Sequence, residues 1–100
     1  MPIFTKEDIP EEDLREEFIC AASGPGGQHV NKTATAVRLI FNAVGSGILN
    51  ERAKSRLYAI AGTHATDGTI VILVKDSRSL AMNRELARER LAAMIAQALV

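Results

Sequence analysis

The sequence predicts a single small α+β domain in which a three-stranded sheet packs against helices, in the order β-β-α-β-α. Its 100 residues suffice for one hydrophobic core but not for a second domain of typical size. Three stretches have strand character and two have apolar residues at helical spacing, while repeats, low-complexity tracts and obvious linkers are absent. We therefore treat residues 1–100 as one domain.

The first two strands are predicted at residues 14–21 and 35–43. In the stretch LREEFICA, Leu14, Glu16 and Phe18 alternate with the residues between them, as in a strand. Pro10 precedes this stretch and is typical of a break between elements. The stretch TAVRLIFNA is rich in β-branched and aromatic residues and carries a second alternating apolar set, formed by Val37, Leu39 and Phe41. The segment between the two stretches is thus expected to connect two strands.

A helix is predicted after the break VGSG at residues 44–47. Asn50 can cap its first turn, and Gly62 is suited to end it. Apolar residues recur at helical spacing between these two positions: Leu49, Ala53, Leu57 and Ile60. The basic residues Arg52, Lys54 and Arg56 are expected on the solvent face of this helix.

The C-terminal part of the chain is predicted to form a buried strand and a long closing helix. The stretch TIVILVK, residues 69–75, follows the turn dipeptide Asp67-Gly68 and is too apolar to have an open face. From Ser79 onward an apolar stripe alternates with charged residues, as in an amphipathic helix. The stripe consists of Leu80, Ala87, Leu91, Met94, Ile95 and Ala98.

Cysteine content and hydropathy favour a cytoplasmic protein. Cys20 is the single cysteine, which excludes an internal disulfide and leaves no set of cysteine ligands for zinc. The first twenty residues lack the apolar region of a signal peptide, and no run of about 18 apolar residues occurs anywhere. We expect a monomer without a membrane partner.

The charges are distributed unevenly although the formal net charge is zero. Residues 1–20 contain seven acidic and two basic residues, so residues 21–100 contain five acidic and ten basic ones. A zero net charge taken alone argues against a nucleic-acid partner. The excess of positive charge in the second part suits a partner with phosphates, and a solvated charged surface explains it equally well.

The stretch GPGGQHVNK, residues 24–32, is the most unusual in the chain. Its glycines permit positive φ or a close approach of another molecule to the backbone, and Pro25 stiffens the approach to Gly26 and Gly27. A simple hairpin would need two turn residues, which makes this connection longer than folding requires. The spacing matches neither the Rossmann fingerprint nor the P-loop.

Gln28 follows the two glycines and offers an uncharged amide that both donates and accepts hydrogen bonds. Because it does not titrate, it is neither a general base nor a nucleophile, but it can orient water and stabilise an oxyanion. Such a group works best where another group, for instance a substrate hydroxyl in a catalytic RNA centre, handles the proton transfers. The three letters GGQ alone leave a hairpin connection and a catalytic loop both open.

Other combinations of reactive residues are weaker candidates. His29 and His64 lie 35 residues apart without acidic or cysteine companions, so we expect no metal site. Ser23 with His29 lacks the strand-turn-helix elbow and the orienting acid of a hydrolase triad. His29 is instead expected to contact RNA or solvent.

The nineteen residues SGPGGQHVNKTATAVRLIF resemble the catalytic loop of class I peptide-chain release factors, especially the small ribosome-rescue proteins of the ArfB/YaeJ type. The resemblance runs from about Ile9 to Ala96 and includes SRSLAMNRELARERL, which is similar to the family's last helix and its entry. It implies hydrolysis of the ester between nascent peptide and tRNA in the peptidyl-transferase centre, with no metal or organic cofactor. The implied partners are ribosomal RNA and peptidyl-tRNA.

The resemblance also implies roles for single residues. Gln28 corresponds to the family's catalytic glutamine, with Gly26 and Gly27 letting its backbone approach the ester. RNA-binding or loop-positioning roles are implied for six further residues. For Asn31, Lys32 and Arg38, a plain surface or strand-face position is the alternative. These six are Gly24, Pro25, His29, Asn31, Lys32 and Arg38.

Departures from the family pattern refine the expected function. Lys32 is similar to the residue found in the codon-independent members of the family, and the chain has no room for the domains that read a stop codon. Rescue proteins of this type carry a disordered basic tail, whereas this sequence ends at Val100, so we expect the catalytic domain without that tail. Ala21 stands where the family commonly has an arginine. A peptidyl-tRNA hydrolase acting off the ribosome and a non-catalytic ribosome-binding module remain the alternatives.

Overall fold

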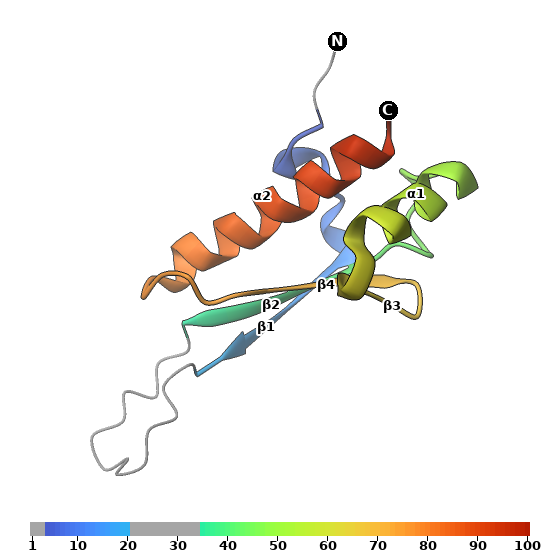
Figure 1. Ribbon diagram of the computed structural model, residues 1–100. Helices are drawn as coiled ribbons and strands as arrows, with labels where there is room; N and C mark the ends of the chain where they lie inside the picture. Colours follow the sequence, from blue (N-terminus) through green and yellow to red (C-terminus); the bar gives the residue numbers. More distant parts are fainter. Residues whose placement is uncertain (1–3, 21–34) are drawn as a thin grey trace, which may run out of the picture.

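The computed structural model describes residues 4–20 and 35–100, which form an antiparallel sheet covered on one face by two helices (Figure 1). The sheet has the strand order β1-β2-β4-β3. The strands are β1 (Leu14–Ile19), β2 (Ala36–Asn42), β3 (Ala65–Thr66) and β4 (Thr69–Val74), and the helices are α1 (Glu51–Ala61) and α2 (Leu80–Ala98). Short 3₁₀ segments η1 (Lys6–Asp8) and η2 (Glu11–Asp13) precede β1, and η4 (Gly62–His64) follows α1.

The α+β class is confirmed, but the predicted count of three strands is wrong. The fourth strand, β3, is two residues long and pairs with β4 in a hairpin closed by Asp67 and Gly68. Two residues are too few to show the alternation from which strands are predicted. The chain order is therefore β-β-α-β-β-α, and β3 forms one edge of the sheet with β1 at the other.

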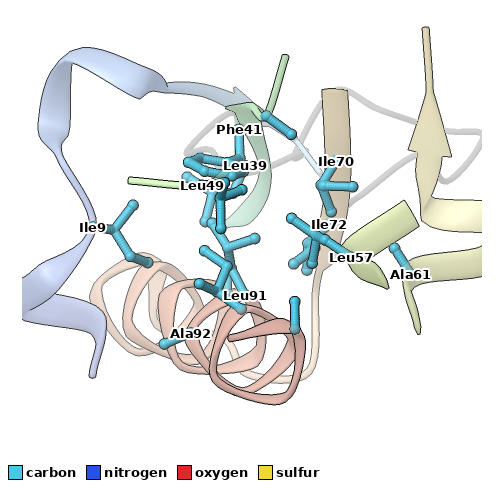
Figure 2. Close-up of a cluster of buried hydrophobic side chains, with 14 of the residues drawn as sticks. Ile9, Leu39, Phe41, Leu49, Leu57, Ala61, Ile70, Ile72, Leu91 and Ala92 are labelled. Carbon is cyan, nitrogen blue, oxygen red and sulfur yellow. The ribbon is translucent and has the colours of Figure 1, made fainter. Parts of the chain in front are cut away.

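One buried cluster joins the sheet to both helices (Figure 2). Phe41 and Leu39 from β2 and Ile70 and Ile72 from β4 point into it, where they meet Leu57 of α1 and further side chains of α2. The predicted apolar sets of both helices are largely confirmed. On α2 the buried residues include Ala87, Leu91, Ile95 and Ala98, while Leu80 and Met94 are half-buried.

The prediction that the strand at residues 69–75 has no open face is wrong. Within β4, Ile70, Ile72 and Val74 are buried, but Leu73 is 46% exposed and Val71 is only partly covered. The side chain positions alternate between the two faces of the sheet. Because both helices lie on the other face, the second apolar set of this strand remains accessible among the described residues (Figure 1).

The predicted helix ends are confirmed by their hydrogen bonds. The side-chain oxygens of Asn50 and Ser79 accept from the backbone N–H groups of Ala53 and Met82, at 2.8 and 3.2 Å. Each bond satisfies a donor that the first helical turn leaves free. Gly62 ends α1 with φ +57°, a conformation that a residue without Cβ adopts without strain.

Two of the three basic residues that were predicted on the solvent face of α1 form hydrogen bonds with backbone carbonyls. Lys54 Nζ donates to the carbonyl of Val44 at 2.8 Å. Arg56 donates to the carbonyls of Gln97 and Ala98, both at 3.2 Å. These carbonyls lie in the last turn of α2, where no following helical residue supplies an N–H donor. A cation at a helix C-terminus is also favoured by the helix dipole. Arg56 thus ties the end of α2 to α1.

Replacing Gly68 with alanine is expected to lower the free energy of unfolding by about 1 kcal/mol or more. Gly68 has φ +82°, and an added Cβ would lie 2.9 Å from the Cβ of Val44. Urea denaturation measures the loss. Gly47→Ala is the matched control, because no atom lies within 4 Å of a Cβ built there. Equal midpoints for the two variants would contradict the strain expected at the hairpin.

Candidate functional site

The predicted catalytic segment is attached to the sheet between β1 and β2. The strands predicted on either side of it are confirmed, and the last cross-strand pair before the segment is Ile19 with Ala36. Most of the candidate residues lie outside the described residues. These are Gly24, Pro25, Gly26, Gly27, Gln28, His29, Asn31 and Lys32. The structure therefore shows the base of the site, formed by the ends of β1 and β2 and the side chains that hold them.

Arg38 is the one predicted site residue that the structure describes. It lies on β2 opposite Glu17 of β1, and its Nη1 donates to Glu17 Oε1 at 2.8 Å. Both side chains are 42% exposed. Opposite charges in such a cross-strand pair stabilise the strand register. Arg38 therefore links β1 to β2.

On the helix-covered face, Glu16 joins edge strand β1 to α2. Its two carboxylate oxygens accept from Nη2 and Nε of Arg84 at 2.9 and 3.0 Å. Arg88 approaches the same carboxylate to 3.5 Å. The guanidinium of Arg84 also lies 5.6 Å from the ring centre of Phe18 on the same strand, within the range of a cation–π interaction. Two side chains of β1 are thus held by one arginine.

The environment of Glu16 lowers its pKa. Burial of the carboxylate raises the pKa, but the hydrogen bonds from Arg84 and the charge of Arg88 together outweigh this effect. The side chain of Glu16 is 13% exposed, so solvent screens these contacts less than it would at the surface. The ionised carboxylate is therefore the form that holds β1 against α2.

Acidification below about pH 4.5 is expected to destabilise the domain, in part through Glu16. Because its folded-state pKa is depressed, the ionised carboxylate contributes stability above the unfolded-state pKa, and this stability is lost as the pH falls through the folded-state pKa. Thermal unfolding between pH 7 and pH 3 measures the loss. Glu16→Gln should lower the melting temperature at pH 7 and flatten its decline at low pH. Parallel curves for both proteins would contradict the role given to Glu16.

Charged residues of the N-terminal segment pair with residues of opposite charge on α2. Arg88 Nη1 lies 2.5 Å from Glu11 Oε2. Lys6 Nζ lies 2.5 and 3.0 Å from carboxylate oxygens of Glu85 and Glu89, whose hydrogen bonds raise the pKa of Lys6. The charge asymmetry of the sequence is thus partly compensated inside the domain, which sequence position alone does not reveal.

Two basic residues remain beside the base of the site without an ion pair in residues 4–20 and 35–100. Lys75 directly follows β4, whose last residue Val74 pairs with Val37 near the start of β2. Arg78 lies three residues further, and both side chains are exposed. Their positive charge is therefore available to a partner at the same end of the sheet from which the 21–34 segment leaves.

Sequence reasoning missed Asn83, a fully buried polar residue in α2. Its side-chain amide bonds to the backbone of Thr35 and Ser77, and Thr35 directly precedes β2. The sequence feature that could have revealed it is the position of Asn83, four and eight residues before the apolar residues Ala87 and Leu91, on the same side of the predicted helix. A polar residue on a buried stripe requires hydrogen-bond partners.

The described part of the chain contains neither a cluster of metal-ligating side chains nor a helix that could span a membrane. Residues 4–20 and 35–100 contain no group of three or more histidine, cysteine, aspartate or glutamate residues that could hold a metal ion. Over the same ranges, neither helix is both long and apolar enough to cross a membrane.

The comparison with protein families decides which family the domain represents. The family model described as the RF-1 domain matches residues 4–100. This chain belongs to the RF-1 domain family. The match spans every element from η1 to α2, so the sheet, both helices and the segment between β1 and β2 all fall within the RF-1 domain.

Curated relatives support the same membership. The chain is 38% identical over 88 residues to "Peptidyl-tRNA hydrolase ArfB" of Pseudomonas putida, a match that covers 87% of this chain and 63% of that protein. It is 38% identical over 88 residues to "Peptide chain release factor 1" of Enterococcus faecalis, covering 88% of this chain and 18% of the relative. A "Peptide chain release factor 2" from Renibacterium salmoninarum is 34% identical over 80 residues, 21% of its length. The RF-1 domain described here thus spans less than two thirds of these relatives.

Proposed function

We propose that this RF-1 domain hydrolyses the ester that links a nascent peptide to tRNA, within the peptidyl-transferase centre of stalled ribosomes and without reading a stop codon. The observation that carries the proposal is the sequence GGQ, placed between β1 and β2 of a chain that belongs to the RF-1 domain family. The ArfB relative, named a peptidyl-tRNA hydrolase, supports the reaction class. Residues 1–100 would form the catalytic domain of such a cytoplasmic, monomeric protein.

In this reaction Gln28 would act through its amide and its backbone N–H. A neutral amide can orient the attacking water and stabilise the negative charge that develops on the ester oxygen. Because the amide does not titrate near neutral pH, the proton transfers would pass through hydroxyl groups of the substrate and of ribosomal RNA. Gly26 and Gly27 would let the backbone approach the ester closely. The proposed reaction requires no metal ion or organic cofactor.

Binding to ribosomal RNA would use basic residues around the base of the site. His29, Asn31 and Lys32 flank Gln28 in the sequence, and Gly24 with Pro25 leads into the glycine pair. Lys75 and Arg78 add exposed positive charge at the same end of the sheet. Lysine and arginine are the usual partners of backbone phosphates.

Replacing Lys75 or Arg78 with alanine is expected to weaken ribosome binding several-fold. Each residue neutralising one phosphate should also contribute about one unit to the slope of log affinity against log salt concentration. Co-sedimentation at a series of salt concentrations measures both effects. Arg52→Ala is the control, because Arg52 is exposed in the first turn of α1 and away from the base of the site. A loss as large for Arg52→Ala as for the other two would contradict a localised phosphate contact.

Two alternatives make different predictions in one assay. A hydrolase that acts off the ribosome would cleave free peptidyl-tRNA, although the segment offers no titratable general base beside Gln28 other than His29. A binding module would associate with ribosomes and leave the ester intact. Incubating the chain with free peptidyl-tRNA and with stalled ribosomal complexes, and measuring the released peptide, distinguishes all three.

A further inference from the structure

The Asn83 side chain connects α2 to the base of the candidate site. Asn83 is fully buried at the fourth residue of α2. Its Nδ2 donates to the carbonyl of Thr35 at 2.6 Å and to the carbonyl of Ser77 at 2.8 Å, and its Oδ1 accepts from the N–H of Ser77 at 3.0 Å. Both hydrogens of the amide nitrogen are therefore used, each by a backbone carbonyl.

The bond to Thr35 differs from the other two in what it joins. Ser77 lies six residues before Asn83, so the bonds to Ser77 hold only the turn that leads into α2. Thr35 lies 48 residues before Asn83 and one residue outside the last cross-strand pair, Ile19 with Ala36. The amide thus fixes the chain at the point where it enters β2, and Gln28 is seven residues upstream of that point.

A side chain that only filled the core would not need this chemistry. The neighbouring buried positions of the same helix stripe are apolar, at Ala87 and Leu91. An asparagine in their place requires its polar atoms to be satisfied, which makes it sensitive to small displacements of its partners. Such a buried, fully bonded amide holds one backbone arrangement in preference to others.

We propose that Asn83 is a positioning residue for peptide release, which holds the Thr35 end of the segment containing Gln28 at a fixed place on the domain. The proposal rests on the proposed function, because it assigns Asn83 an effect on the ester-hydrolysing step. Asn83 acts through Thr35 and does not touch the substrate. Reactions that depend on orientation are sensitive to this kind of support, since a displacement of about 1 Å can lower a rate by about 100-fold.

The first test separates the chemical step from binding. Asn83→Ala removes all three bonds, whereas Asn83→Asp keeps the shape and the acceptor for Ser77 but offers no hydrogen to Thr35 at neutral pH. The rate constant of peptide release at saturating concentrations of stalled ribosomes is expected to fall at least about ten-fold in both variants. The affinity for those ribosomes is expected to change less than two-fold.

Two controls distinguish positioning from a general loss of stability. Ser77→Ala removes the hydroxyl that accepts from the Ser79 N–H at 2.9 Å, so it loosens the same turn while the Asn83 amide keeps its backbone partners. Ile95→Val reduces the core on the same helix, away from Thr35. All variants are compared at a temperature where circular dichroism shows them folded. Both controls are expected to keep the release rate within two-fold of the original protein.

Amide hydrogen exchange gives a readout that is independent of activity. Loss of the bond to Thr35 is expected to raise the exchange rate of the amides at 36 and 37 in the Asn83 variants by several-fold relative to Ser77→Ala and Ile95→Val. A structural role confined to the turn before α2 would accelerate exchange near Ser77 alone.

The outcomes separate this inference from the proposed function. If Gln28→Ala releases peptide normally, the proposed function fails, whatever the Asn83 variants do. If Gln28→Ala is inactive but the Asn83 variants release peptide as fast as the two controls, the positioning role is overturned. Failure of both Asn83 variants to fold, with the controls folded, would also overturn it, because the side chain would then serve folding itself.

Discussion

Replacing Gln28 with alanine is expected to slow peptide release by at least about 100-fold, the usual cost of removing one oxyanion-stabilising donor. The melting temperature is expected to stay nearly unchanged, because a polar residue after two glycines contributes little to core packing. The release of labelled peptide from ribosomes carrying peptidyl-tRNA measures the rate, and circular dichroism measures the melting temperature.

Two further variants define what the glutamine supplies. Gln28→Glu keeps the size of the side chain but removes the amide hydrogens, so it is expected to be about as inactive as Gln28→Ala. Gln97→Ala removes an exposed glutamine near the end of α2 and should change neither rate nor stability. A Gln28→Ala protein that retains half of the release rate would contradict the catalytic role of Gln28.

Replacing Phe41 with alanine is expected to lower the free energy of unfolding by about 3–5 kcal/mol, the usual cost of removing a buried aromatic ring. Phe41 is fully buried on β2 and lies beside Leu39 and Leu49 in the core (Figure 2). Since small domains are stable by about 5–15 kcal/mol, this loss leaves little margin against unfolding. Urea denaturation monitored by circular dichroism measures the change.

Phe18→Ala is the matched control for Phe41→Ala. The same ring is removed from the neighbouring strand, but Phe18 is 48% exposed and its ring lies against the guanidinium of Arg84. A partly exposed cation–π pair contributes about 0.5–1 kcal/mol, so the loss should be much smaller than at Phe41. Equal losses for the two phenylalanines would contradict the difference in burial between Phe41 and Phe18.

The regular elements of the fold could be predicted because their signals are local. Alternation identified β1 and β2 within two residues of their observed ends. Asn50, Gly62 and Ser79 marked helix ends because their side chain or backbone acts on the adjacent turn. These features depend on neighbours in the sequence, which a single sequence displays.

The features that sequence reasoning missed depend on distant partners or on very short segments. Strand β3 has two residues and exists because Asp67 and Gly68 fold it back onto β4. The open face of β4 was missed because an apolar run does not show which neighbours cover it. The ion pairs of Glu11 and Lys6 with α2 join residues about 80 positions apart, which no periodicity reveals.

The residues of the candidate site also differ in whether their roles could be predicted from the sequence. The role of Gln28 and its glycines is predicted from an unusual local composition and from a family resemblance, and the structure describes the strands on either side of that segment. Asn83 escaped detection because its role lies in a bond to Thr35, 48 residues away. A polar residue within a predicted apolar stripe was the one available sign.

The most direct test of the proposed function compares two substrates for the purified chain. One is free peptidyl-tRNA, and the other is the same peptidyl-tRNA bound in ribosomes that have no codon in the decoding site. We expect release of the peptide from the ribosomal complex, dependent on Gln28, and no comparable hydrolysis of the free substrate. Equal hydrolysis of both substrates, or binding to ribosomes without release of the peptide, would contradict the account.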